Sequence, residues 1–332
     1  MAITLKEIAK LAEVSTSTVS RVMNDDPRIS SATKDKVIKC LETLDYKAPA
    51  LSKWYQTKDT YTIGFVTPDI SENFFMNIAA KVDETLFKSG YSLLICGTNN
   101  NVKCEKNRIE VLRDKQVDGV IIVPTTNSSS NYEILRQAGI PVVIVDRYIE
   151  NFAADMVMVD NINAAYSAIE YLIDKGASRI GFIGGEKTLS NAQERFKGYE
   201  RALRDYNIQP DQKIIKYGDF TEESGYLLAK ELLNIEKPPQ FLFVSNYYMH
   251  IGVMRYLSER KVNGIASIIH TAGFDDIRFP PHLKGVSVIV SQPISEIGET
   301  AAKLILKRIG SKVQKSRYVT KRLKTKLIEY GV

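Results

Sequence analysis

Histidine and cysteine are scarce in this chain of 332 residues, which contains three of each. Cys40, Cys96 and Cys104 form neither a CxxC pair nor a zinc-binding spacing, and the histidines follow no H-x-x-x-H pattern. This usage suits a reducing compartment with buried or idle thiols. We therefore expect no metal site and no cofactor.

Long apolar runs are also absent. No stretch approaches the roughly 18 consecutive apolar residues of a membrane-spanning helix. The N-terminal MAITLKEIAKLAEV mixes Lys and Glu into its apolar pattern and lacks a small-residue cleavage site. We expect no membrane partner and a cytoplasmic location. With 44% apolar and 25% charged residues the composition is that of an ordinary globular protein, and the length predicts two or three domains.

Complete catalytic motifs are missing as well. Gly184 to Thr188 follows a predicted strand and ends in Lys-Thr, but a phosphate loop needs glycine at position 186, where glutamate stands. No strand is followed by G-x-G-x-x-G, and no G-x-S-x-G elbow is present. His270 is expected to end a strand near a cleft, where it would contact a ligand rather than act as a base. We expect no catalytic residues and no enzymatic activity.

The net charge of +6 suggests a nucleic-acid partner, but the charge lies in the wrong place. Residues 1–58 carry ten Lys/Arg against seven acids, whereas residues 303–332 carry ten against one and residues 59–302 have a net charge of −6. The C-terminal pattern RYVTKRLKTKLIE predicts final core strands with a solvated basic face. Charge alone therefore does not locate a DNA-binding surface.

Three segments differ in periodicity, which predicts the domain boundaries. Residues 1–46 show only helical spacing. Residues 47–60, the expected hinge, are polar, contain Pro49 and lack a core face, as in a linker or a marginal helix. From residue 61 onward short apolar runs alternate with amphipathic stretches, which predicts two doubly wound parallel-sheet subdomains with a cleft between them. We expect the first subdomain at about 61–161 plus 292–320 and the second at about 162–291 plus 321–332.

The expected elements of this α/β core follow from the same alternation. Strands are expected at 62–66, 92–97, 119–123, 141–145, 156–159, 179–183, 213–217, 241–244, 267–270 and 286–290. Helices are expected at about 74–89, 103–115, 129–138, 162–175, 191–205, 222–234, 247–260 and 294–309. Because ligands bind at the carboxyl ends of strands in open α/β sheets, the residues just after the strands are the candidates for a binding site.

The first 46 residues predict an all-α helix-turn-helix headpiece. Thr4 and Glu7 have the spacing of a capping box, and Ser15 can cap a second helix that runs to Asn24. About three residues join these two helices, as in helix-turn-helix motifs. A third helix from about residue 31 is expected to close the core with Val37, Ile38, Leu41 and Leu44.

The second helix has one apolar and one hydrogen-bonding face. Val19, Val22 and Met23 share the apolar side. The polar side has short hydroxyls, an amide and one arginine but no acid, and this composition suits a helix in the major groove, where Arg21 can fork onto guanine. An ordinary surface helix is the alternative, although such faces usually include glutamate. The polar face consists of Thr16, Ser17, Ser20, Arg21 and Asn24.

The chain resembles the LacI/GalR family of bacterial transcription regulators through TLKEIAKLAEVSTSTVSRVMN (4–24), LETLDY (41–46) and the α/β core that follows. The resemblance implies a headpiece, a hinge helix and a core similar to periplasmic sugar-binding proteins. It also implies a homodimer on a near-palindromic double-stranded DNA operator. The expected DNA-binding residues of the headpiece are Thr4, Ser15, Thr16, Ser17, Thr18, Ser20, Arg21 and Asn24.

The hinge departs from the family pattern Y-x-P-N-x-x-A-R-S-L, which lies here on residues 46–55. The proline is displaced by one position, and Tyr55 stands where the family has a leucine that wedges into the minor groove. An aromatic ring can also wedge between base steps. Trp54, the only tryptophan, is an alternative wedge or packs at the dimer interface. Trp54 and Tyr55 are both included among the expected DNA-binding residues.

The resemblance also implies an effector site in the cleft. Phe74 and Phe75 match the family's N-P-F-F-like segment, with Glu72-Asn73 in place of the proline, while Tyr247 and His250 replace a family acid and alanine and suggest an altered pocket. Stacking aromatic rings and charged side chains that fork to hydroxyls or carboxylates favour a sugar or sugar acid. The expected effector-binding residues are Phe74, Phe75, Asp146, Arg147, Asn191, Arg195, Phe220, Asn246 and Asp275.

These features predict a DNA-binding transcriptional regulator, most simply a repressor, whose operator affinity is controlled by a small effector. Two alternatives use the same residues differently. One is a cytoplasmic metabolite-binding protein or enzyme on the same α/β core, and the other is an architectural DNA-binding protein. The helix-turn-helix face argues against the first, and the large core argues against the second.

Overall fold

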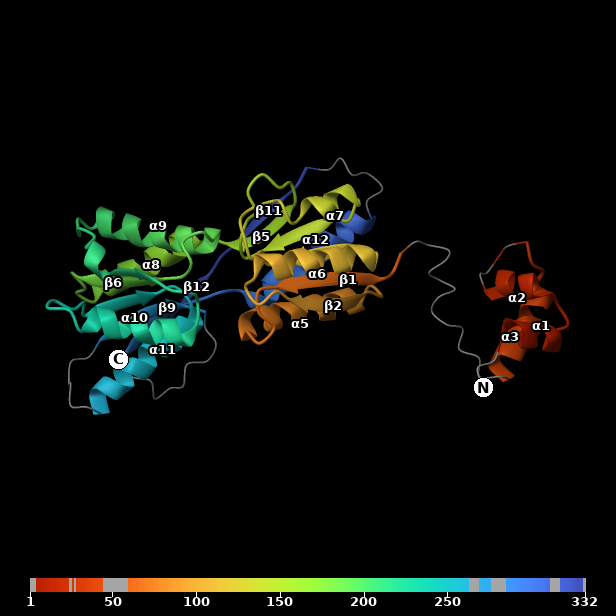
Figure 1. Cartoon of the computed structure of the whole chain (residues 1–332), viewed down its shortest axis with the longest axis horizontal. Coiled ribbons are helices and arrows are strands. Elements are labelled where there is room, and N and C mark those ends of the chain that lie inside the picture. Colours follow the sequence, from red (N-terminus) through yellow and green to blue (C-terminus); the bar gives the residue numbers. More distant parts are fainter. Residues whose placement is uncertain are drawn as a thin grey trace. The chain divides into compact units, whose positions relative to one another are not determined.

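The computed structural model describes residues 4–23, 26, 28–43, 59–262, 269–275, 285–310 and 317–330 (Figure 1). The chain forms two compact units, residues 1–60 and residues 61–332. Asn24, Leu44, Trp54, Tyr55 and most of the expected hinge lie outside the described residues. Among the described residues, no helix has the length and apolar character needed to cross a membrane.

The first unit contains the three expected helices, α1 (Leu5–Leu11), α2 (Thr16–Met23) and α3 (Ser31–Thr43). The prediction that Ile38 helps to close the core is wrong, because its side chain is 44% exposed. Val37, Cys40 and Leu41, at i, i+3 and i+4, form the inward stripe of α3, so the neighbouring position turns outward. The buried core consists of Ile8, Ala9, Ala12, Val19, Val22 and Val37.

The second unit contains two six-stranded sheets, as the fold class predicted. The first sheet, which defines the first subdomain, has the strand order β11-β5-β4-β3-β1-β2 and is parallel throughout. The second has the order β12-β10-β9-β8-β6-β7, and only β12 runs antiparallel to its neighbour. The strands of the first sheet are β1 (Thr62–Thr67), β2 (Ser92–Gly97), β3 (Gly119–Ile122), β4 (Val142–Val145), β5 (Asp155–Val159) and β11 (Thr320–Leu323). Those of the second are β6 (Ile180–Gly184), β7 (Ile215–Tyr217), β8 (Phe241–Val244), β9 (His270–Phe274), β10 (Val286–Ser291) and β12 (Lys326–Glu329).

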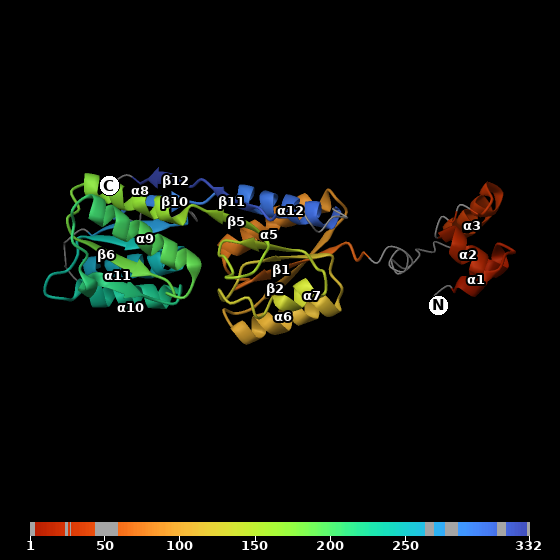
Figure 2. The ribbon, with the colours of Figure 1, turned by 90° about the horizontal axis from the view of Figure 1, so that it is seen from above.

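Helices cover both faces of each sheet because the central strands, such as β3, β4 and β8, are apolar and buried on both sides. In the first subdomain α5 (Asn73–Phe87) and α12 (Ile294–Gly310) cover one face, and α6 (Val102–Asp114) and α7 (Glu133–Gln137) cover the other (Figure 2). In the second, α8 (Asn161–Asp174) and α9 (Ser190–Asp205) lie opposite α10 (Glu222–Leu233) and α11 (Tyr247–Val262). A short 3-10 helix, η1 (Gln212–Ile214), precedes β7.

Several expected boundaries differ from the structure. The helix expected at 129–138 is the shorter α7, and the strand expected at 213–217 begins only at Ile215, after η1. The strand expected at 267–270 runs instead from His270 to Phe274, because the apolar count selected SIIH while the strand HTAGF is built from small and polar residues. Gly273 is needed there, since a Cβ atom at that position would meet the His250 ring. The expected return to the second subdomain after residue 320 is three residues early, because β11 pairs with β5 from Thr320 to Leu323.

Candidate functional site

The polar face of α2 is the candidate DNA-reading surface. The Ser15 hydroxyl accepts a hydrogen bond from the Thr18 amide at 3.0 Å and caps the helix N-terminus. Its oxygen also lies 2.7 Å from the Ser17 hydroxyl and 2.8 Å from the Thr18 hydroxyl. Three expected DNA-binding side chains are thus joined in one hydrogen-bonded group at the start of α2.

The two faces of α2 separate as its sequence pattern requires. Val19 and Val22 are buried, whereas Thr16, Ser17 and Arg21 are exposed, and Thr18 and Ser20 are half-buried. Thr4 lies elsewhere, at the start of α1, where its amide donates to the Glu7 carboxylate at 2.6 Å. The Glu7 carboxylate therefore completes the capping box, and Thr4 is occupied in holding α1.

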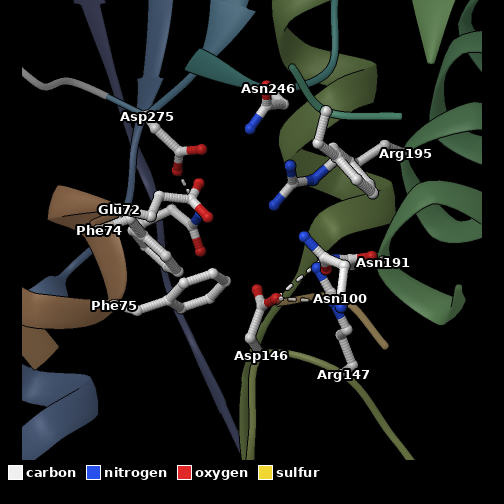
Figure 3. Close-up of a pocket in the computed structure, with 12 residues that line it drawn as sticks. Glu72, Phe74, Phe75, Asn100, Asp146, Arg147, Asn191, Arg195, Asn246 and Asp275 are labelled. Atoms are coloured by element: carbon white, nitrogen blue, oxygen red, sulfur yellow. Dashed lines mark hydrogen bonds and ion pairs between the residues drawn. The ribbon is translucent and has the colours of Figure 1, made fainter. Parts of the chain in front are cut away.

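A pocket between the two subdomains is the candidate effector site (Figure 3). Its non-protein space, which includes open solvent at its mouth, is about 380 Å³. All nine expected effector-binding residues line it. They follow the carboxyl ends of β1, β4, β6, β7, β8 and β9, which is where ligands bind in open α/β sheets.

Arg195, on α9, is one of two arginines in the pocket and is fully buried. Its Nε donates to Asn161 Oδ1 at 2.9 Å, and its Nη1 donates to the Ser245 carbonyl at 2.5 Å. The guanidinium carbon lies 3.8 Å from the centre of the Phe274 ring. Burial lowers the pKa of Arg195, while the nearby Asp275 charge opposes that shift. These contacts fix the guanidinium plane before any ligand arrives.

Asp146 and Arg147 follow β4 and form a second charged group. Arg147 Nε lies 3.4 Å from Asp146 Oδ2, and its Nη1 donates to the Pro124 carbonyl at 2.9 Å. Its guanidinium carbon is 5.6 Å from the centre of the Phe220 ring. Asn191 Nδ2 donates to Asp146 Oδ2 at 2.9 Å, so this group joins the first subdomain to α9 of the second.

Four pocket residues have left-handed backbones. Asp146, Phe220 and Asp275 adopt φ values of 68°, 69° and 71°, and Asn100 adopts 52°. Each of these conformations costs free energy in a residue other than glycine, and such residues persist where the surrounding structure holds them. Their concentration around one cavity indicates a preorganised site.

Asp275, which follows β9, is the second buried acid of the pocket. Its Oδ1 accepts a hydrogen bond from Gln292 Nε2, and its charge acts on Glu72, whose carboxyl group also points into the cavity in Figure 3. Burial raises the pKa of Asp275, and Arg195 opposes that shift. Asn246, after β8, uses its side-chain oxygen to accept from the Met249 amide at 2.9 Å, which caps α11.

Three lining residues were not predicted as site residues: Glu72, Asn100 and Gln292. Glu72 precedes α5, and burial together with the Asp275 charge raises its pKa to about 8. All three lie just past the carboxyl ends of strands, β1, β2 and β10 respectively. The rule that ligands bind just after the carboxyl ends of strands, here called the strand-end rule, would therefore have predicted them if applied to every strand.

Two histidine predictions are wrong. His270 begins β9 rather than ending a strand, so it lies away from the cleft, stacked on Phe241 with ring centroids 5.3 Å apart. His250 does not line the pocket; it is buried in the second subdomain, with Nε2 2.7 Å from the Thr271 hydroxyl. Tyr247 is also absent from the pocket lining and packs beside Met254 and Ile289. The changes at positions 247 and 250 therefore alter packing in the second subdomain.

The family models match both units of the chain. Residues 4–48 match the model described as bacterial regulatory proteins of the lacI family. Residues 60–329 match the model of periplasmic binding proteins and the sugar-binding domain of the LacI family. The chain belongs to the LacI family. It is accordingly a DNA-binding transcriptional repressor with an effector-binding core, and it is not an enzyme.

Individual relatives agree with the family assignment. The HTH-type transcriptional repressor PurR of Vibrio atlanticus (strain LGP32) is 31% identical over 95% of this chain and 94% of its own length. The solved transcriptional regulator CelR–cellobiose complex is 26% identical, covers 99% of this chain and 100% of its own, and has a TM-score of 0.73. The Lac repressor bound to ONPG, 22% identical with 99% of each chain covered and a TM-score of 0.81, shares the fold of this LacI-family protein.

Proposed function

We propose that this LacI-family repressor binds a near-palindromic operator as a homodimer and that a small effector in the pocket controls the binding. The convergence of nine expected residues from both subdomains in one cavity carries this proposal. Because operator DNA is its target, we place the protein in the cytoplasm.

The pocket lies where a ligand would control the relative orientation of the subdomains. Asn191 of the second subdomain donates to Asp146 of the first, and the Tyr148 amide donates to Ser190 Oγ at 3.0 Å. A ligand bound among these groups interacts differently with the two orientations of the subdomains. Only that difference in affinity shifts the equilibrium, by a coupling of typically 1–3 kcal/mol.

On the DNA side, α2 is the proposed reading helix. Arg21 projects from its exposed face and has the geometry to fork onto guanine O6 and N7. Thr16 and Ser17 are exposed at its N-terminal end, where recognition helices contact base edges. Ser15 and Thr18 are proposed to hold the adjacent phosphates, with Ser20, Asn24, Trp54 and Tyr55 as further DNA contacts and Thr4 orienting α1.

The favoured effector is a sugar. The pocket combines aromatic side chains, Phe74, Phe75 and Phe220, with charged groups that can bind ring hydroxyls. CelR, one of the relatives of known structure, was solved as a cellobiose complex. A purine base is the second candidate, because the same rings can stack on a flat heterocycle.

The test begins with a thermal-shift screen of the full chain against sugars, sugar acids and purines. A ligand that raises the melting temperature is then added to an operator-binding titration. We expect it to change the operator Kd about 5- to 150-fold and to lose this effect in Asp146→Asn. A ligand that binds the pocket and leaves operator affinity unchanged would contradict the proposed control.

A further inference from the structure

In the part of the chain that the structure describes, the polypeptide passes between the two subdomains at three places. The first lies between β5 and α8, at residue 160, and the second lies between β10 and α12, at residues 292–293. The third lies between β11 and β12, at residues 324–325. We call these segments the crossings. Because domains reorient through backbone changes at the few residues that connect them, a change in subdomain orientation must act through the crossings.

Arg195 connects the pocket to the first crossing. Figure 3 shows its guanidinium group pointing into the cavity. Its Nε donates to Asn161 Oδ1 at 2.9 Å, and Asn161 begins α8 directly after this crossing. The Asn161 side chain is fully buried, so this contact is shielded from water. A ligand that contacts the guanidinium group therefore also acts on the first crossing.

Glu194, which precedes Arg195 on α9, extends this connection to the third crossing. Its Oε2 accepts from Asn161 Nδ2 at 3.1 Å, and its Oε1 accepts from Arg322 Nη2 at 3.0 Å. Arg322 lies on β11, just before the third crossing. Burial lowers the pKa of Arg195, and the Glu194 charge is among those that oppose this shift. Glu194 therefore joins the pocket arginine to residues beside two crossings, one in each subdomain.

The second crossing has a pocket contact of its own. Gln292 belongs to this crossing, and its Nε2 donates to Asp275 Oδ1 in the pocket. Each of the three crossings is thus connected to a charged pocket residue, either directly or through Glu194.

The Glu194–Arg322 ion pair is poorly placed to stabilise the fold. The Arg322 side chain is 43% exposed, and exposed ion pairs contribute little to folding. Neither residue lines the pocket. The pair nevertheless joins α9 of the second subdomain to β11 of the first, beside the segments on which the subdomains would turn. Its geometry therefore depends on their relative orientation.

We call Asn161, Glu194 and Arg322 the crossing group. We propose that the crossing group transmits a ligand's contact with Arg195 to the crossings, so that the effector changes operator affinity. Its members are positioning residues, which are needed for the response to the ligand and not for holding it. This rests on the proposed function, because it concerns the ligand of the same pocket. A bond that differs between two orientations biases the equilibrium between them, and a ligand that moves one end of the bond changes that bias.

The first measurement needs no ligand. The full chain is titrated with an operator that wild type has selected from random duplexes, and the operator Kd is compared for Arg322→Gln, Glu194→Gln and the double variant. Each single variant should change the Kd about threefold or more, in the same direction, because both break one bond. The double variant should change it no more than the larger single effect. The two substitutions change the net charge in opposite senses, so a general electrostatic effect on DNA binding would shift the two Kd values in opposite directions.

Two further variants serve as controls. Lys321→Gln removes an exposed cation from the neighbouring position of β11, whose side chain points to the opposite face of the strand, and should leave the Kd within about twofold of wild type. Arg322→Lys should do the same, because Arg322 makes a single contact with Glu194 that an ammonium group can replace. Unchanged Kd values in both single variants, or shifts of opposite sign, would overturn the role of the crossing group.

The second measurement adds a ligand, with cellobiose, glucuronate and adenine as probes of the three classes in the screen. For a probe that changes the wild-type operator Kd about 5- to 150-fold, the change should be at least about threefold smaller in Arg322→Gln. The Kd of the probe for the free chain should stay within about threefold of wild type, and Arg322→Lys should restore the response.

The outcomes separate this inference from the proposed function. A wild-type response that Arg322→Gln and Glu194→Gln keep in full would overturn the crossing group alone. If no probe of the three classes changes the wild-type operator Kd, the proposed control by the pocket falls, and the role of the crossing group falls with it.

Discussion

The α2 surface, which we propose binds DNA, and the core pocket, which we propose binds the effector, are built in opposite ways. On α2 the side chains are short, exposed and hydrogen-bonded to their neighbours, as Ser15, Ser17 and Thr18 are. In the pocket the charged side chains of Asp146, Arg147, Arg195 and Asp275 are buried, and each has a protein partner. Replacing an exposed residue of α2 should remove only a contact with DNA. Replacing a buried pocket residue also leaves its protein partners unsatisfied.

This difference predicts that substitutions on the exposed face of α2 change DNA binding without changing stability. Substitutions in the pocket should change effector binding and stability together. The largest effect should come from Arg195→Met, which leaves Asp275 and the Ser245 carbonyl buried without their guanidinium. We expect urea unfolding to show a loss of about 3–5 kcal/mol and calorimetry to show no effector binding. Arg204→Met on the same helix, whose side chain is 75% exposed, is the control and should change neither by more than about 0.5 kcal/mol. Unchanged stability in Arg195→Met would contradict the prediction that stability and effector binding change together in the pocket.

His250 tests whether burial alone, outside the pocket, affects stability without affecting binding. Burial lowers its pKa to about 3, so the unfolded chain binds a proton more readily than the folded chain below pH 6.5. Stability should be intact above pH 6.5 and fall by about 3 kcal/mol by pH 4, at roughly 1.4 kcal/mol per pKa unit.

His250→Gln should reduce this acid-induced loss in pH-dependent urea unfolding while the effector Kd at pH 7.5 stays within about twofold of wild type. If the variant keeps the full pH dependence, another group is responsible. If the effector Kd changes tenfold, the division between core and pocket is wrong.

Arg21→Ala addresses the exposed surface. It should weaken operator binding by about 1–3 kcal/mol and relax the preference at one base pair in each half-site. Urea unfolding of the chain should stay the same, because Arg21 is exposed. Lys39→Ala on α3 removes an exposed cation and should leave the base preference intact. Wild-type sequence preference in Arg21→Ala would refute the assignment of α2 to the groove.

The smallest expected effect is that of Ser15→Ala. Its hydroxyl caps α2 by accepting from the Thr18 amide at 3.0 Å, and losing such a cap costs about 1 kcal/mol of stability. A lower melting temperature of the headpiece transition in calorimetry would show this. The effector Kd should not change, since Ser15 does not line the pocket.

Most of the fold and most of the residues that line the pocket could be predicted from the sequence. The contacts between these residues could not. Helix limits follow from amphipathic spacing, and the strand-end rule places Asp146, Asn246 and Asp275 because the backbone itself fixes those positions. The approach of Glu72 to Asp275 depends on how two subdomains close on each other, which no local pattern encodes. The position of His250 was predicted wrongly for a related reason. Its place in a helix does not reveal which residues pack against its side chain.

The central claim is that pocket occupancy and operator binding are coupled, and reciprocal titration tests it most directly. For a ligand found by the screen, the operator Kd is measured with and without ligand, and the ligand Kd with and without operator. Linkage requires the two factors to be equal, at about 5- to 150-fold, and to be lost in Asp146→Asn. A ligand whose binding requires Asp146, but which leaves the operator Kd unchanged, would contradict the account.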